Sequence, residues 1–171
     1  MVPALACCRE SLIVMRLAAV VVLVLAGLMP AAAQDARLPD DPAKVASVLK
    51  DAGLFGTWAV DCEAAATPAN PHVSIMLAAA GTVLERHELG SDYEVNDYRV
   101  VAAQRLSKTR VSVEVLFQPG SEREQEQQLI FAVGNDTRRT ILNHIVGGAV
   151  LVKDGLVAGH SAKTPTLRKC G

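Results

Sequence analysis

The residues that could do acid–base or metal chemistry are few and far apart in this chain. The four histidines are His72, His87, His144 and His160. None has a partner at the spacing of an H-x-H or H-E-x-x-H metal motif. Three of them could still converge through the fold, but we interpret all four as unrelated surface or loop residues. The sequence therefore predicts no metal site and no bound cofactor.

A hydrolytic nucleophile would need a serine or cysteine next to a base. The G-x-S-x-G pattern of a nucleophile elbow is absent from the sequence. His160 and Ser161 are adjacent, so in an extended chain their side chains point apart. Asp92, Glu94 and Asp97 could supply paired carboxylates, but Asp92 lies in a turn sequence and a solvated loop explains them better. We therefore predict no catalytic residues and a protein that is not an enzyme.

The first thirty-three residues have the pattern of a secretory signal peptide. Arg16 precedes a run of thirteen uncharged residues at 17–29, Pro30 ends the run, and three alanines at 31–33 supply a cleavage site. The run is shorter than the roughly 18 apolar residues that a membrane-spanning helix needs. We predict a signal peptide at 1–33, a periplasmic or secreted protein, and no membrane span after the signal is removed.

The mature chain would be slightly acidic. Removing 1–33 takes away Arg9, Arg16 and Glu10, which leaves 15 basic and 17 acidic side chains. This balance argues against nucleic acid or an anionic membrane as the partner, because both require a basic face. We expect a monomer whose partner is a small apolar molecule or an envelope or extracellular protein.

Two cysteines, Cys62 and Cys170, remain after the predicted cleavage, because Cys7 and Cys8 belong to the signal peptide. An even pair in an oxidising compartment is most simply a disulfide. Two free thiols or half of a metal site are the alternatives, although no C-x-x-C or H-x-C spacing supports a metal site. We predict a Cys62–Cys170 disulfide, which would close a loop of 108 residues.

Residues 34–53 are predicted to form a polar lead-in followed by one short helix. Asp41 is a suitable N-cap, and Pro42 at the first helical position loses no hydrogen bond. Gly53 gives a natural C-terminal stop. The apolar face of this helix consists of Val45, Val48, Leu49 and Ala52.

From residue 54 onward, apolar and polar residues alternate, as is typical of β-strands. The alternation is clearest at 109–117, where three valines and Phe117 share one face. Turn-forming sequences such as Asp154-Gly155 separate the segments. The predicted strands cover 54–62, 71–79, 82–88, 93–104, 109–117, 125–133, 137–146 and 148–153, with a last pairing near 156–159 and 164–170.

Short strands joined by tight turns are typical of an antiparallel meander. Residues 54–171 are therefore predicted to form an all-β domain, an up-and-down meander that closes into a barrel of about eight strands. A two-layer sandwich is the alternative. The predicted disulfide favours the barrel, because Cys62 ends the first strand and Cys170 ends the last, and closure brings these strands side by side and removes the exposed edges.

Gly56-Thr57-Trp58, after a short helix and at the head of the first predicted strand, resembles the G-x-W signature of lipocalins and related calycin-like barrels. This resemblance implies that Trp58 closes one barrel end and that a basic residue of the last strand packs over it, with Arg168 as the candidate. If Cys62 faces Cys170 in the ladder, Arg168 lies opposite residue 64. For Arg168 to pack over Trp58, the two strands then need another register, or one of the cysteines must lie outside the strand ladder.

These features predict an exported binding module without catalytic activity. The leading expectation is a lipocalin-like carrier of a small apolar ligand, with Trp58, Phe117 and Phe131 as the candidate ligand-binding residues. The first alternative is a periplasmic inhibitor of an extracellular hydrolase of the protease or lysozyme type. The second is a structural envelope protein that binds no ligand. An internal cavity of a few hundred Å³ would favour the carrier.

Overall fold

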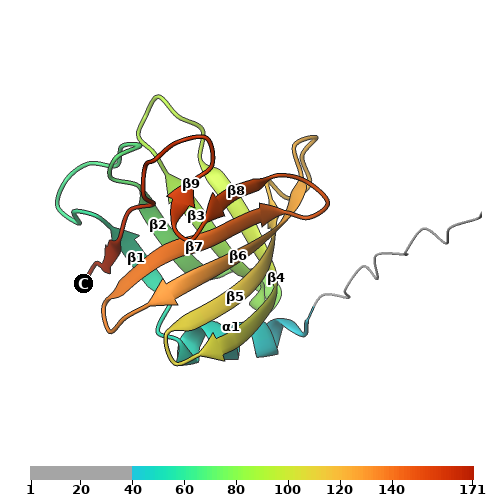
Figure 1. The fold of residues 1–171 in the computed structure, drawn as a ribbon. Helices are drawn as coiled ribbons and strands as arrows, with labels where there is room; N and C mark the ends of the chain where they lie inside the picture. The colour runs from blue at the N-terminus through green and yellow to red at the C-terminus, as the bar shows by residue number, and fades with distance from the viewer. Residues whose placement is uncertain (1–39) are drawn as a thin grey trace, which may run out of the picture. The chain divides into compact units, whose positions relative to one another are not determined.

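A single antiparallel sheet of ten strands forms the body of the protein in the computed structural model, which describes residues 40–171 (Figure 1). The predicted signal peptide at 1–33 lies outside the described residues. The strands are β1 (Gly56–Ala59), β2 (His72–Leu77), β3 (Val83–Glu88), β4 (Asn96–Ser107), β5 (Arg110–Phe117), β6 (Gln125–Val133), β7 (Thr137–Ile145), β8 (Val150–Lys153), β9 (Leu156–Val157) and β10 (Leu167–Lys169).

The sheet closes on itself as a barrel of eight strands. Strands β1 to β7 are paired in sequence order, and β10 pairs with both β1 and β7. Strands β8 and β9 extend the sheet beyond β7. The predicted closed meander of about eight strands is therefore confirmed, and each predicted strand overlaps an observed one. Closure through β10 pairs the backbone N–H and C=O groups of β1 and β7 that an open sheet would leave exposed.

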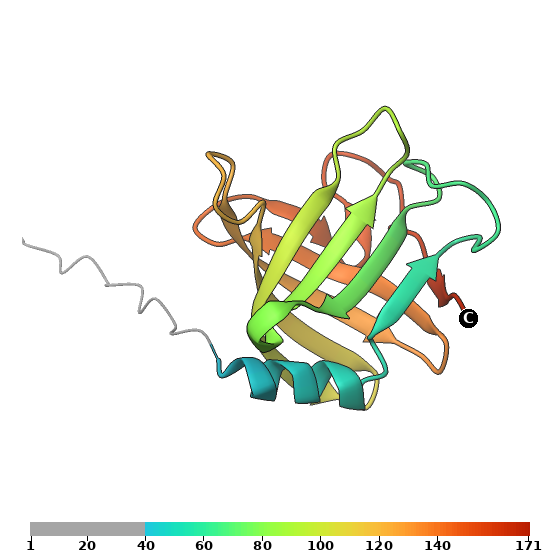
Figure 2. The ribbon, with the colours of Figure 1, turned by 180° about the vertical axis from the view of Figure 1, so that it is seen from behind.

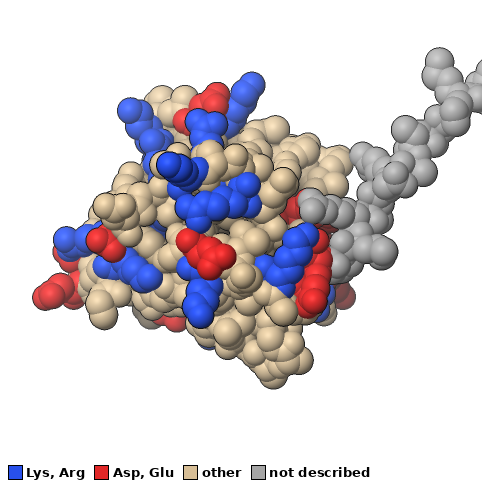
Figure 3. Space-filling view, turned by 90° about the horizontal axis from the view of Figure 1, so that it is seen from below, with Lys and Arg blue, Asp and Glu red and all other residues tan. Residues whose placement is uncertain are grey.

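The single α-helix, α1 (Pro42–Asp51), lies across one end of the barrel (Figure 2). The Asp41 carboxylate caps it by accepting a hydrogen bond of 2.9 Å from the Ala43 amide. Val45 and Leu49 on its apolar face are buried in the barrel core. Seen from the helix side, side chains close the surface, with basic and acidic groups interspersed (Figure 3). No helix within residues 40–171 has the length and apolar composition that a membrane crossing requires.

Trp58 closes this helix-covered end from within. Its side chain is only 1% exposed, and its indole N–H donates a hydrogen bond of 2.9 Å to the Leu54 carbonyl. Lys169 lies opposite it in the β1–β10 ladder, with Nζ 5.4 Å from the ring centroid. The expectation that Arg168 covers the tryptophan is wrong, because Arg168 lies opposite Ala59 and pairs instead with Asp61. In the observed register, the basic residue opposite Trp58 is Lys169, one position after the predicted Arg168.

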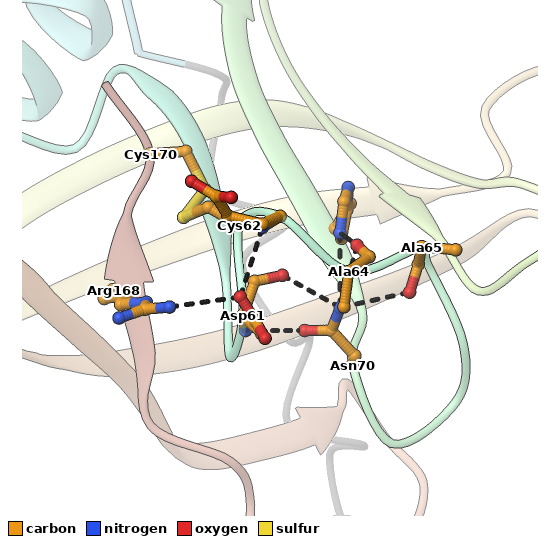
Figure 4. Close-up of polar contacts among 9 residues, drawn as sticks. Asp61, Cys62, Ala64, Ala65, Asn70, Arg168 and Cys170 are labelled. Carbon is orange, nitrogen blue, oxygen red and sulfur yellow. Dashed lines mark hydrogen bonds and ion pairs between the residues drawn. A yellow bond between two sulfur atoms is a disulfide. The ribbon is translucent and has the colours of Figure 1, made fainter.

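The predicted Cys62–Cys170 disulfide is present, with a Cα–Cα distance of 5.6 Å. Cys62 lies beyond the end of β1, which the prediction had placed within the strand, while the Cys170 amide bonds to Thr57 O. The Asn70 side chain organises the loop that contains Cys62 through bonds to the backbone of Asp61 and of residues 64 and 65 (Figure 4). The cysteine therefore lies off the ladder, and the bond joins the loop after β1 to the end of β10.

Candidate functional site

The barrel interior is hollow at the end away from α1. The 3-10 turn η1 (Ala79–Gly81), which joins β2 to β3, lies near α1. Val73 at the start of β2 and His87 at the end of β3 are therefore near the opposite end, which we call the barrel mouth. There they line a cavity of about 280 Å³. This mouth cavity is the candidate site, because a concave pocket with a few convergent polar groups is the usual form of a ligand site.

The wall of the mouth cavity combines apolar and polar side chains. Pro68 and Pro71 come from the loop between β1 and β2, and Thr164 and Pro165 from the segment before β10. The barrel strands contribute apolar side chains such as Leu129 and polar ones that include His87, Asn96, Tyr98, Arg138, Thr140 and Asn143. The site is thus built by strands that point side chains inward and by two loops at the rim.

A buried ion pair lies beside the cavity, between Glu85 of β3 and Arg138 of β7. Both residues are 2% exposed. Arg138 Nη2 donates to Glu85 Oε1 over 2.8 Å, and Nη1 lies 3.4 Å from Oε2. The guanidinium carbon also lies 4.2 Å from the centroid of the Phe131 ring. The two-pronged pair and the ring hold Arg138 in one orientation at the cavity wall.

His87 and Tyr98 complete the polar side of the cluster. His87 Nε2 lies 2.6 Å from Glu85 Oε1. Since an ionised carboxylate only accepts hydrogen bonds, this nitrogen is the donor. The His87 ring also contacts Tyr98 with centroids 4.8 Å apart, and Tyr98 contacts Phe117 at 5.1 Å. With Phe131 packed against Arg138, the cluster is therefore a connected set of ionic, hydrogen-bonded and aromatic contacts across the five strands β3 to β7.

Two pKa shifts follow from this arrangement. Burial raises the pKa of Glu85, but the charge of Arg138 and the hydrogen bond from His87 outweigh it and lower the pKa from 4.5 to about 2. Glu85 therefore stays ionised at physiological pH. Burial, together with the Glu85 charge, raises the pKa of the Tyr98 phenol above its ordinary value, so this hydroxyl stays neutral.

Some polar groups near the mouth have no partner in the described part of the chain. Asn143 Oδ1 and Gln127 Oε1 are buried and accept no hydrogen bond from residues 40–171. They come from neighbouring strands, since Gln127 lies opposite Ile145 and Asn143 opposite Leu129 in the β6–β7 ladder. Asn143 lines the cavity itself. Buried polar atoms normally have partners, so an unpaired amide oxygen in a cavity wall indicates a ligand or water that donates a hydrogen bond to it.

No family model, curated protein or solved structure matches the chain. A function must therefore be inferred from the geometry and charge of the site. Within residues 40–171, no group of three or more His, Cys, Asp or Glu side chains could hold a metal ion.

The three residues that the sequence suggested for ligand binding lie around the site and not on its wall. Trp58 is buried at the closed end. Phe131 lies beneath Arg138, and Phe117 packs against Tyr98. None of the three lines the mouth cavity, where the contacts come from other residues. Phe117 and Phe131 support wall residues, and a direct role in binding stays a prediction.

His87 and Arg138 were missed as site residues by sequence reasoning, as was Glu85. We had interpreted His87 as a surface or loop residue. A signal was present in strand β3, where Glu85 and His87 share the inward face with buried Val83. An acidic and a titratable residue on a core face indicate a buried partner, which is Arg138.

Proposed function

We propose that this chain is an exported, non-catalytic binding module that carries one small ligand in the mouth of a lipocalin-like barrel. The observation that supports this most is the mouth cavity of about 280 Å³, with apolar walls and a fixed polar cluster on one side. An apolar cavity of about 150 Å³ can hold benzene, so a molecule built around one aromatic ring fits this site. The polar wall extends the expected ligand from an apolar molecule to an amphipathic one.

Two features of the scaffold support a preformed site. The barrel is closed, and the Cys62–Cys170 disulfide ties the loop after β1 to β10, whose Leu167 lines the cavity. A site on rigid elements binds with less ordering cost than one on loose loops. A disulfide also suits an oxidising compartment, which agrees with the predicted signal peptide and an exported protein.

The first test is native mass spectrometry of the protein exported through its own N-terminal segment, with denaturation of the same sample. We expect a bound small molecule that is released on unfolding. Asn143→Phe should exclude it, because the added ring fills the cavity and this amide makes no hydrogen bond within residues 40–171. Gln104→Phe is the matched control, since Gln104 is exposed on β4 outside the barrel wall.

A ligand retained by Asn143→Phe would place the binding site elsewhere. A bare mass for the wild-type protein, with no rise in melting temperature in a panel of small organic molecules, would contradict the carrier. A bound ligand stabilises the folded state by about 2.7 kcal/mol at a concentration of 100 Kd, so such a rise is measurable. That double negative would favour the inhibitor or the structural envelope protein.

The exposed loop between β3 and β4 supports the inhibitor as a second candidate. This loop protrudes beyond the barrel mouth (Figure 1), and its Tyr93 and Val95 are 54% and 39% exposed. Exposed apolar side chains on a protruding loop are typical of an interaction surface. An inhibitor would slow a protease or lysozyme at stoichiometric concentration, and Tyr93→Ser would relieve the inhibition. No effect on a panel of such hydrolases would exclude this candidate.

A further inference from the structure

The charges around the mouth cavity identify a ligand class more closely than its volume does. We infer that the ligand is a small organic anion, with an apolar body about the size of an aromatic ring and one carboxylate. This inference rests on the proposed function, because it concerns the same cavity. It goes further by naming the chemistry that the site recognises and the residue that recognises it.

The cavity wall is basic and has no acidic side chain. Of its sixteen residues, Arg138, Arg139 and His87 can carry a positive charge, and none is Asp or Glu. The carboxylate of the cluster is Glu85, whose two oxygens already accept hydrogen bonds from the Arg138 guanidinium. Its Oε1 also accepts one from His87. Glu85 therefore neutralises the charge of Arg138, and the positive charge of Arg139 at the cavity wall is not neutralised by it.

Arg139 has hydrogen-bond partners but no counter-ion in the described chain. Its Nε donates to Thr164 Oγ1 over 3.1 Å, and its Nη2 donates to the Gly155 carbonyl over 2.7 Å. Both acceptors are neutral, and both contacts are partly buried. No carboxylate of residues 40–171 forms a salt bridge with Arg139. A partly buried cation without a counter-ion favours an anionic ligand. A guanidinium held in place by two such bonds still has N–H groups left for a carboxylate.

The remaining wall explains why the anion must also carry an apolar part. Pro68, Pro71, Val73 and Leu89 present apolar surface to the cavity. A bare inorganic anion would leave this surface in contact with water, whereas an aromatic or aliphatic body would bury it. Asn143 also lines the cavity, and its Nδ2 protons can donate to the carboxylate end. Its Oδ1, which is unpaired within residues 40–171, can accept a hydrogen bond only from a water or a donor group on the ligand.

The test compares three molecules with the same ring and different charge by isothermal titration calorimetry. Benzoate is the anion, benzamide the neutral isostere and benzylammonium the cation. We expect benzoate to bind roughly tenfold more tightly than benzamide, the ratio that one charge-assisted hydrogen bond supplies. Benzylammonium should bind most weakly. Inorganic phosphate serves as the probe without an apolar body and should not bind measurably.

Variants of Arg139 separate its charge from its role in holding the loop. Arg139→Gln should reduce the preference for benzoate to within about twofold of benzamide, while Arg139→Lys should keep most of it. Arg99→Gln removes an exposed arginine on the outside of β4 and should change nothing. Melting temperatures of all variants show whether each one is folded.

The outcomes distinguish this inference from the function on which it rests. Equal or tighter binding of benzamide would overturn the anion inference and leave the carrier in place. A loss of binding for all three ring compounds in Arg139→Gln would also overturn it, since Arg139 would then only hold the 155–164 segment. If no probe binds the wild-type protein and its exported form carries no ligand, both the inference and the carrier fail.

Discussion

Loss of the Cys62–Cys170 disulfide is expected to lower the free energy of unfolding by about 4–5 kcal/mol. The bond spans 108 residues, and a cross-link of that length removes conformational entropy from the unfolded chain by about this amount in the chain-entropy model. It encloses nearly the whole barrel, because β2 to β10 lie between the two cysteines. The expected loss is a large share of the 5–15 kcal/mol that stabilises a typical domain.

The measurement is urea unfolding of the wild type and of the Cys62→Ser/Cys170→Ser variant, with and without a reducing agent. The reductant should destabilise the wild type and leave the variant unchanged. The variant therefore controls for any effect of the reductant other than reduction of this disulfide. We also expect weaker ligand binding in the variant, since β10 supplies Leu167 to the cavity wall. A loss below about 1 kcal/mol would show that the non-covalent contacts alone close the barrel.

Glu85→Gln is expected to cost about 3–5 kcal/mol of stability. The substitution leaves the Arg138 guanidinium in the barrel interior at 2% exposure without its counter-ion, and breaking a buried pair on one side has a cost of this size. It also replaces the acceptor of the His87 hydrogen bond. Unfolding by denaturant at pH 7 measures the loss.

Strand β3 offers a matched control for this prediction. Arg86 and Asp97 form a pair of similar length, 2.9 Å, on the outside of the barrel, where their side chains are 45% and 34% exposed. Asp97→Asn should change stability by no more than about 1 kcal/mol, because exposed pairs contribute little. The double variant Glu85→Gln/Arg138→Met should recover most of the loss, since it removes both charges. A single variant as stable as the wild type would contradict the expected cost.

The same pair predicts how stability changes with pH. The pKa of Glu85 is lowered in the folded state to about 2, from the ordinary value of 4.5. Its contribution is therefore complete above about pH 4.5 and is lost as the pH falls towards 2, on the order of 3 kcal/mol in all. The stability curves of the wild type and Glu85→Gln should approach one another across this window. Parallel curves would show that Glu85 does not titrate with folding.

Local patterns account for the elements that sequence reasoning predicted well. Helix α1 begins at Pro42 after the Asp41 cap, as these residues predict, because capping depends only on neighbours in the chain. The strands follow from alternation and turn chemistry, and Asp154-Gly155 adopts the two positive φ angles that its tight turn requires. Strand ends were less predictable. β1 ends at Ala59 because the Asn70-bound loop leaves the ladder.

The site was less accessible from sequence, for a reason that Arg138 illustrates. Its partner Glu85 is 53 residues away in sequence and lies on a strand that is not its neighbour in the sheet. Alternation shows that a side chain points inward, but it does not show which inward residue of a distant strand lies at the same height. A charge on a core-facing position indicates only that some partner exists.

The amino-acid sequence by itself determined the all-β class, the order of the strands, the capping helix and the disulfide, because each depends on local periodicity, turn residues or the count of cysteines. Only the tertiary structure decided that Lys169 lies opposite Trp58, that α1 covers one end while the other is hollow, and that Glu85, His87 and Arg138 meet beside the cavity. These depend on the register and stagger with which the strands close, and closure is a property of the whole barrel.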